Sequence, residues 1–123
     1  MSLFGFLTLI AIVIVICLHV AFFVLEAFLW TRPTGRRVFG LTPELAQGSK
    51  SLAINQGLYN LFLAAGLVWS LVARDCTFEI KIFFLSCIII AGIVGGITAK
   101  RSILFVQALP GLLTLVLVFF TQR

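Results

Sequence analysis

Between positions 3 and 30 the chain reads LFGFLTLIAIVIVICLHVAFFVLEAFLW, with His19 and Glu26 as its only acidic or basic side chains. A transmembrane helix needs about 20 mostly apolar residues, because each residue adds about 1.5 Å along the axis and the hydrocarbon core is about 30 Å thick. Apolar residues surround this helix on all sides, as expected in lipid, and the alternating pattern of a membrane β-strand is missing. The stretch therefore predicts a membrane-spanning helix.

Three further stretches are long and apolar enough to cross a bilayer. They cover residues 51–73, 82–99 and 103–121. Together with the first span at residues 3–30, they predict an all-α protein, an integral-membrane four-helix bundle that forms a single domain over residues 1–123.

The composition supports the same interpretation. Apolar residues make up 62% of the 123 positions and charged residues 11%, and the mean hydropathy is +1.23. A soluble domain keeps roughly a quarter of its residues charged, and a disordered chain has low hydrophobicity, so both classes are excluded. The net charge of +5 comes without a basic face carrying interleaved polar residues. We therefore expect no nucleic-acid partner and assign the Lys and Arg residues to membrane flanks.

The distribution of Lys and Arg predicts an orientation. Six lie between spans one and two or between spans three and four, namely Arg32, Arg36, Arg37, Lys50, Lys100 and Arg101. Three lie on the other side, namely Arg74, Lys81 and Arg123. Because cytoplasmic loops are enriched in Lys and Arg, both termini are predicted to be non-cytoplasmic. The protein is expected to be a multi-pass protein of the cytoplasmic membrane.

The longest connection between predicted spans is the segment 31–50. Pro33 and Gly35 are expected to end the first helix, because Pro cannot continue it and Gly permits a turn. Thr42, followed by Pro and Glu, has the pattern of a helix start. This predicts a short helix at residues 43–47, lying at the level of the lipid headgroups.

Arg36 and Arg37 in this connection have two interpretations. They either anchor the topology by contacting anionic lipid or form a mouth that attracts an anionic ligand. Reversing both charges separates these alternatives, because an anchor alters orientation whereas a mouth alters only ligand affinity.

Polar side chains inside the spans need partners, since a central charge costs roughly 2.5 to 3.5 kcal/mol on insertion scales. His19 and Glu26 are seven residues apart, which places them on one face of their helix. If this face and the polar faces of spans two and four turn inward, they form a polar cavity that opens to the cytoplasm. The alternative is a hydrogen-bonded zipper that only holds helices together, although amides without a carboxylate would suffice for that. The candidate residues are His19, Glu26, Asn55, Gln56, Tyr59, Asn60 and Gln107.

Span three carries small residues in place of polar ones. Gly92 and Gly96 form a small-xxx-small pair, which lets helix backbones approach closely. The pattern predicts packing against another helix, either in the same chain or in a second subunit.

Three short motifs are informative as a set. They are RRVF at 36–39 followed by Pro43-Glu44, LFLA at 61–64, and KRS at 100–102 leading to Gln107 and Pro110. Together they resemble the MAPEG superfamily (membrane-associated proteins in eicosanoid and glutathione metabolism). A second resemblance covers nearly the whole chain and is to a family of short bacterial four-helix membrane proteins of unknown function. It is carried by His19, Glu26, Asn55-Gln56-Gly57, Tyr59-Asn60 and Gln107 with Pro110.

The MAPEG resemblance implies a homotrimer of four-helix protomers, with sites between subunits where glutathione meets a lipophilic substrate. Asn55 matches the Asn of the superfamily's glutathione pattern. The Glu of that pattern falls on Gly57 or Leu58, and its Arg has no counterpart in span two before Arg74. The bacterial resemblance implies the inner membrane as the location.

Three functions from different classes fit the sequence. The first is a MAPEG-like pocket that binds, or binds and modifies, a small lipophilic ligand. Glu26 and His19 are then the catalytic, proton-handling groups, and the other polar residues of the spans bind the ligand together with the Arg pair. The second is a small proton-coupled exporter that uses the membrane carboxylate. The third is a scaffold that binds another membrane protein through Gly92 and Gly96. No metal is expected, since one His and one Glu seven residues apart make too weak a site.

Overall fold

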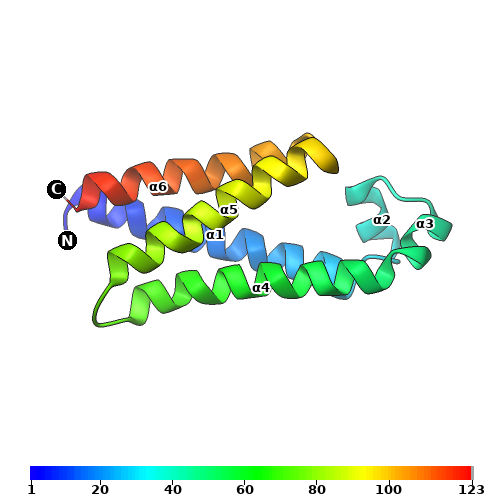
Figure 1. The fold of residues 1–123 in the computed structure, drawn as a ribbon, viewed down its shortest axis with the longest axis horizontal. Coiled ribbons are helices and arrows are strands. Elements are labelled where there is room, and N and C mark those ends of the chain that lie inside the picture. Colours follow the sequence, from blue (N-terminus) through cyan, green and yellow to red (C-terminus); the bar gives the residue numbers. More distant parts are fainter. Residues whose placement is uncertain (123) are drawn as a thin grey trace. The chain divides into compact units, whose positions relative to one another are not determined.

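The structure is a computed structural model that describes residues 1–122. Its helices are α1 (Leu3–Ala27), α2 (Pro33–Phe39), α3 (Pro43–Gly48), α4 (Lys50–Val72), α5 (Thr77–Thr98), the π-helix η1 (Leu104–Ala108) and α6 (Leu109–Thr121). No strand occurs among these described residues. Figure 1 shows the order of the helices along the chain. The prediction of an all-α fold is confirmed.

Four helical segments within residues 1–122 are long and apolar enough to cross a membrane. They are Leu3–Ala27, Lys50–Val72, Thr77–Thr98 and Leu104–Thr121. The four predicted spans are therefore confirmed, and the protein fits a multi-pass membrane protein in a lipid bilayer. The third span, α5, begins at Thr77, five residues before the predicted start at 82. It includes a polar first turn in which Glu79 lies near the positive end of the helix dipole.

The chain divides into two compact units. One unit contains residues 1–18 and 63–122, and the other contains His19–Phe62. Each unit is described on its own below, and the organisation as a single domain stays a prediction.

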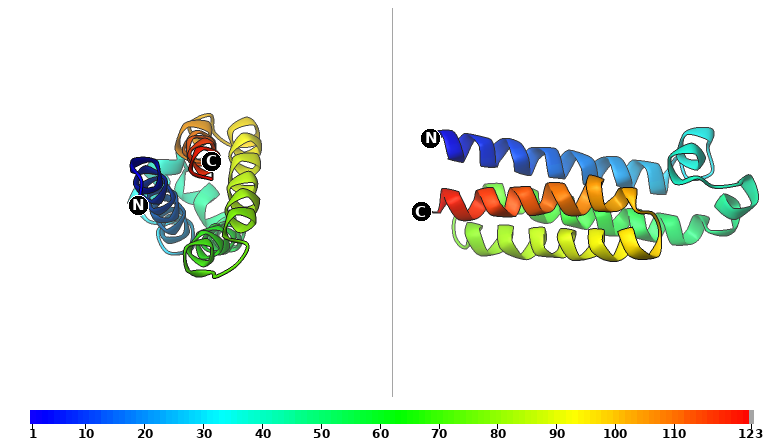
Figure 2. Two further views of the ribbon diagram at one scale, coloured as in Figure 1. Left: turned by 90° about the vertical axis from the view of Figure 1, so that its left-hand side faces the viewer. Right: turned by 90° about the horizontal axis from the view of Figure 1, so that it is seen from above.

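The first unit has an apolar core to which four helices contribute. Its buried members are Ile12, Val15, Leu67, Leu85, Ile88 and Val118. The two ends of the chain also meet in this unit (Figures 1 and 2), where the Thr8 and Thr121 hydroxyl oxygens are 2.6 Å apart. Each hydroxyl also lies 2.8 Å from a carbonyl oxygen four residues earlier on its own helix, so one threonine donates to its carbonyl and the other donates to the partner hydroxyl.

Helix α5 packs closely against η1 and the start of α6. A Cβ on Gly92 would lie 2.6 Å from the Ala108 backbone nitrogen, and a Cβ on Gly96 would lie 2.3 Å from Leu104 Cγ. In lipid the association of helices relies on such close packing, because the tails are as apolar as the side chains. The predicted small-residue face of span three is thus used within the chain.

The π-helical turn explains how span four accommodates Pro110. Proline has no N–H and cannot donate to the carbonyl four residues earlier. Within η1 the register widens, so that the Leu109 N–H bonds to the Leu104 carbonyl five residues before it. The structure thus places a π turn, Leu104–Ala108, one residue before Pro110.

The second unit contains the connection between α1 and α4 (Figure 2). Helix α1 ends at Ala27 rather than at residue 30, and Pro33 does not end a helix. It occupies the first turn of the new helix α2, where its missing N–H is not needed. Gly35 is buried inside α2 instead of forming a turn, because this helix packs directly on the Leu29 carbonyl.

The predicted helix start at Thr42 is confirmed. Helix α3 covers Pro43–Gly48, and the Thr42 hydroxyl accepts a hydrogen bond from the Leu45 N–H at 3.2 Å. The Trp30 indole N–H donates to the Ser49 hydroxyl at 3.0 Å, which ties the end of α3 to the segment after α1.

Thr42→Ala is expected to speed amide hydrogen exchange in α3 about five-fold. Loss of an N-cap oxygen costs about 1 kcal/mol, and the Leu45 N–H loses its acceptor. Exchange of the backbone amides, followed by mass spectrometry of the purified protein in detergent, measures this effect. Thr34→Ala in α2 is the matched control, since Thr34 is exposed and does not cap its helix. Equal exchange rates in the two variants would contradict the capping role.

Candidate intramembrane polar site

One narrow face of α1 is buried along the helix. The buried positions are Thr8, Ile12, Val15, His19 and Glu26. Their spacing of three, four and seven residues is that of a single helix stripe. His19 and Glu26 therefore share a buried face, as predicted, and are two turns apart on it.

His19 is fully buried and contacts an aromatic ring of its own helix. Its ring lies edge-on to Phe22, with ring centroids 5.5 Å apart. An edge-to-face arrangement of this kind is favourable beyond the area it buries.

Helix α4 approaches α1 closely beside Glu26. A Cβ on Gly57 would lie 3.1 Å from Glu26 Cβ and 3.3 Å from the Phe23 carbonyl oxygen. Both distances are tighter than ordinary contacts, so glycine at this position lets the two helices come together. The buried face of α4 includes Ala53, Gly57 and Asn60.

Glu26 and Asn60 form the centre of the site. The Asn60 Nδ2 donates to Glu26 Oε1 at 3.2 Å and to Oε2 at 3.3 Å. Only 4% of Glu26 and 7% of Asn60 is exposed. A buried carboxyl group without hydrogen bonds is costly, so the amide compensates part of the cost of placing Glu26 here. The sequence predicted that these two residues can meet, and the structure brings them together.

Three other predicted residues of α4 lie elsewhere on the helix. The side chains of Asn55, Gln56 and Tyr59 are exposed, and 55% of Tyr59 is accessible. The helical period of 3.6 residues explains this result, since residues 53, 57 and 60 occupy one face and residues 55, 56 and 59 occupy others. The predicted convergence of the whole patch on Glu26 is therefore corrected to Asn60 alone within α4.

Gln107 is buried within η1 and belongs to the other compact unit. The Arg pair of the connection lies in the last turn of α2, with Arg36 half-buried and Arg37 exposed. Cations in the last turn of a helix interact favourably with its negative end. This local role adds to the two interpretations drawn from the sequence.

Asn60→Ala is expected to lower the free energy of unfolding by about 1–3 kcal/mol, because Glu26 then remains buried without its donor. In a Glu26→Gln background the same substitution is expected to cost less, since a neutral amide is less costly to leave unpaired. Unfolding in detergent, followed by tryptophan fluorescence, gives the four free energies of this double-mutant cycle. Additive effects would show that the contact contributes nothing. Gln56→Ala is the control, because Gln56 is exposed on the same helix.

Comparison with known proteins places the chain among bacterial relatives. The chain is 29% identical over 119 residues to the uncharacterized protein YpaA of Lactococcus lactis subsp. lactis (strain IL1403), and the match covers 93% of this chain and 100% of the relative. No solved structure matches. The resemblance to the MAPEG superfamily stays a prediction, as these matches do not test it. Residues 13–119 match the family model described as "Protein of unknown function (DUF1304)", and the chain belongs to this family.

Proposed function

We propose that the Glu26–Asn60 pair is the polar centre of an intramembrane site that binds a small lipophilic ligand. The observation that carries the proposal is a buried carboxyl group inside a span, held by one amide that donates to both of its oxygens. Burying a carboxyl group inside a membrane span costs free energy, and membrane proteins retain such groups where they have a function. Two amides would join the helices equally well, so helix association alone gives no reason for a carboxylate.

The chemistry of the pair defines what such a ligand carries. Glu26 accepts hydrogen bonds and exchanges a proton, so it suits a ligand with a basic or hydroxyl group on an apolar body. Asn60 fixes the orientation of the carboxyl group and has a carbonyl oxygen that can accept from the ligand. His19, two turns away on the same face of α1, is the second proton-handling group in this proposal.

The location, orientation and assembly complete the proposal. The protein lies in the bacterial cytoplasmic membrane with both termini on the non-cytoplasmic side, as the six-to-three distribution of Lys and Arg predicts. It forms a homo-oligomer, which is a trimer if the MAPEG resemblance holds, and glutathione is then the cofactor to test.

The structure also bears on the alternative functions. Glu26 lies in the last turn of α1, next to Ala27, whereas an exporter that couples protons to transport is expected to hold its carboxylate near mid-membrane. The Gly92 and Gly96 face is occupied by η1 of the same chain, so a scaffold would need a different surface. Both observations favour the ligand site.

Labelling with dicyclohexylcarbodiimide, a lipophilic reagent specific for carboxyl groups, tests the proposal. The reagent adds to a carboxyl group and leaves an N-acylurea, which increases the mass by one carbodiimide. We expect an adduct on Glu26 that peptide mass spectrometry locates, that disappears in Glu26→Gln, and that a competing lipophilic amine suppresses. Glu44→Gln is the control, since Glu44 is exposed on α3 and its loss is expected to leave the Glu26 adduct intact. Absence of the Glu26 adduct, while a water-soluble carbodiimide still labels Glu44, would contradict the proposal.

A further inference from the structure

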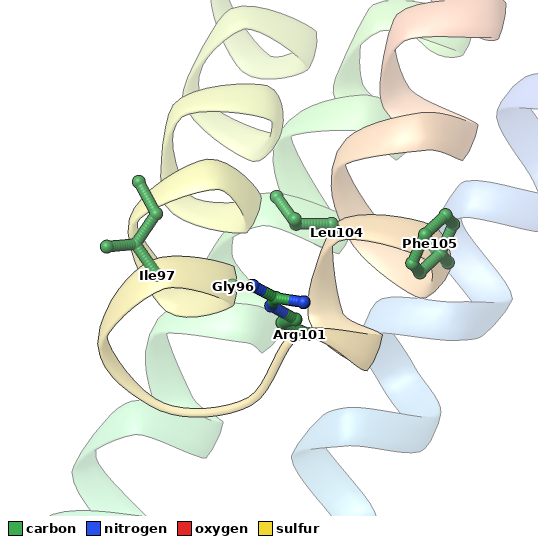
Figure 3. A pocket seen from close by; sticks show the side chains of 5 residues that line it. All are labelled: Gly96, Ile97, Arg101, Leu104 and Phe105. Carbon is green, nitrogen blue, oxygen red and sulfur yellow. The ribbon is translucent and has the colours of Figure 1, made fainter.

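An open depression lies where α5 ends and η1 begins (Figure 3). It has a volume of about 600 Å³ and is lined by Gly96, Ile97, Arg101, Leu104 and Phe105. All five residues belong to one compact unit, and none of them is part of the Glu26–Asn60 site. The walls are therefore built from the end of one span, the start of the next and the turn between them.

The π-helical turn and a glycine shape this depression. Leu104 packs directly over Gly96, where a Cβ would be only 2.3 Å from Leu104 Cγ. Next to this contact Ile97 and Phe105 remain 77% and 67% exposed. Two large apolar side chains are thus presented on either side of a close helix contact.

Arg101 gives the depression a positive charge at one end. It is exposed and lies in the turn between Thr98 and Leu104, outside both candidate spans. Figure 3 shows its guanidinium group beside Gly96, at the end of α5. A residue that flanks two spans lies at the level of the lipid headgroups, whereas the apolar walls extend into the hydrocarbon region.

We propose that this depression binds an anionic phospholipid. The phosphate contacts Arg101 through charge-assisted hydrogen bonds, and an acyl chain packs along Ile97, Leu104 and Phe105. A soluble anion would gain nothing from the apolar walls, and a zwitterionic lipid would gain less from the guanidinium. Because the lining combines a positive charge with apolar side chains, the site favours a lipid whose headgroup has a net negative charge.

Native mass spectrometry of the full chain tests this inference, with the protein released from nanodiscs of equal parts phosphatidylglycerol and phosphatidylcholine. The wild-type protein is expected to retain more phosphatidylglycerol than phosphatidylcholine. Arg101→Gln is expected to lower the ratio of the two retained lipids about five-fold, the effect of one Lys or Arg near an anionic surface. Arg74→Gln is the matched control, because Arg74 is an exposed cation that flanks two other span ends and does not line the depression.

Two further arms separate the contributions of headgroup and chain. Phe105→Ala is expected to lower the retention of both lipids while their ratio stays unchanged, because it removes apolar contact only. Excess inorganic phosphate is expected to displace no lipid. If the site bound soluble anions, phosphate would compete for Arg101 and release the lipid. An equal fall in the lipid ratio for Arg101→Gln and Arg74→Gln would overturn the inference, since it would show a general effect of net charge. Unchanged melting temperatures of all three variants confirm that the fold is intact.

Discussion

Gly35→Ala is expected to lower the free energy of unfolding by at least about 3 kcal/mol and to reduce the yield of folded protein sharply. A Cβ at this position would lie 1.9 Å from the Leu29 carbonyl oxygen and 2.5 Å from its carbon. These are backbone atoms, so no side-chain rotation can relieve the overlap. Helix α2 would have to move away from the segment after α1, and the Trp30–Phe39 ring contact at 4.7 Å would be lost with it.

The control for this prediction is Gly48→Ala at the end of α3. Apart from its chain neighbours and the backbone of its own helix, no atom lies within 4 Å of a Cβ built there, and the backbone does not have a positive φ. Alanine at a compatible glycine position stabilises by about 0.4–1 kcal/mol through the unfolded chain. Melting temperatures in detergent, followed by tryptophan fluorescence, compare the two variants. If Gly35→Ala had the same melting temperature as the wild-type protein, this would show that α2 is not packed on Leu29.

Gly92→Ala is the second substitution with a large expected effect, about 2–3 kcal/mol of destabilisation. Its Cβ would lie 2.6 Å from the Ala108 backbone nitrogen and 2.8 Å from Ala108 Cβ. The overlap forces α5 and η1 apart, which weakens the close backbone contact between these two helices. Thermal unfolding and the fraction of monodisperse protein after heating measure the loss.

Two variants sharpen the test of Gly92. Gly95→Ala is expected to cost much less, because the nearest atom to its Cβ is a side-chain methyl of Ile103 at 3.2 Å, which can shift. Ala108→Gly in the Gly92→Ala background is expected to rescue only part of the stability, since the backbone nitrogen remains in the way. Full rescue would indicate that the contact involves side chains alone.

Much of the fold was predictable from sequence because it depends on local properties of the chain that do not require knowledge of tertiary contacts. Apolar runs of sufficient length predict spans wherever they fold, and the N-cap pattern at Thr42 predicts its helix from local chemistry. The meeting of Glu26 and Asn60 was also predictable, since both are polar residues near neighbouring ends of consecutive spans.

The errors arose where tertiary packing overrides a local signal. Pro33 and Gly35 are turn-forming residues, yet here one begins a helix and the other permits a close backbone contact. Asn55 and Gln56 were grouped with Asn60 by proximity in sequence, although the helical period alone separates them from it. The stripe of Ala53, Gly57 and Asn60 was the available signal for the buried face.

The π turn of span four has a consequence for chain length. An α-helix rotates by about 100° per residue, and a π turn accommodates one inserted residue within a locally widened turn, so the helix before it keeps its rotational phase. Deleting one residue of η1 is therefore expected to return this turn to α-helical geometry while the helical segments on either side keep their relative orientation. A chain one residue shorter at this point is expected to keep both the face formed by Gly111, Thr114 and Val118 and the side chains presented at the Arg101 end.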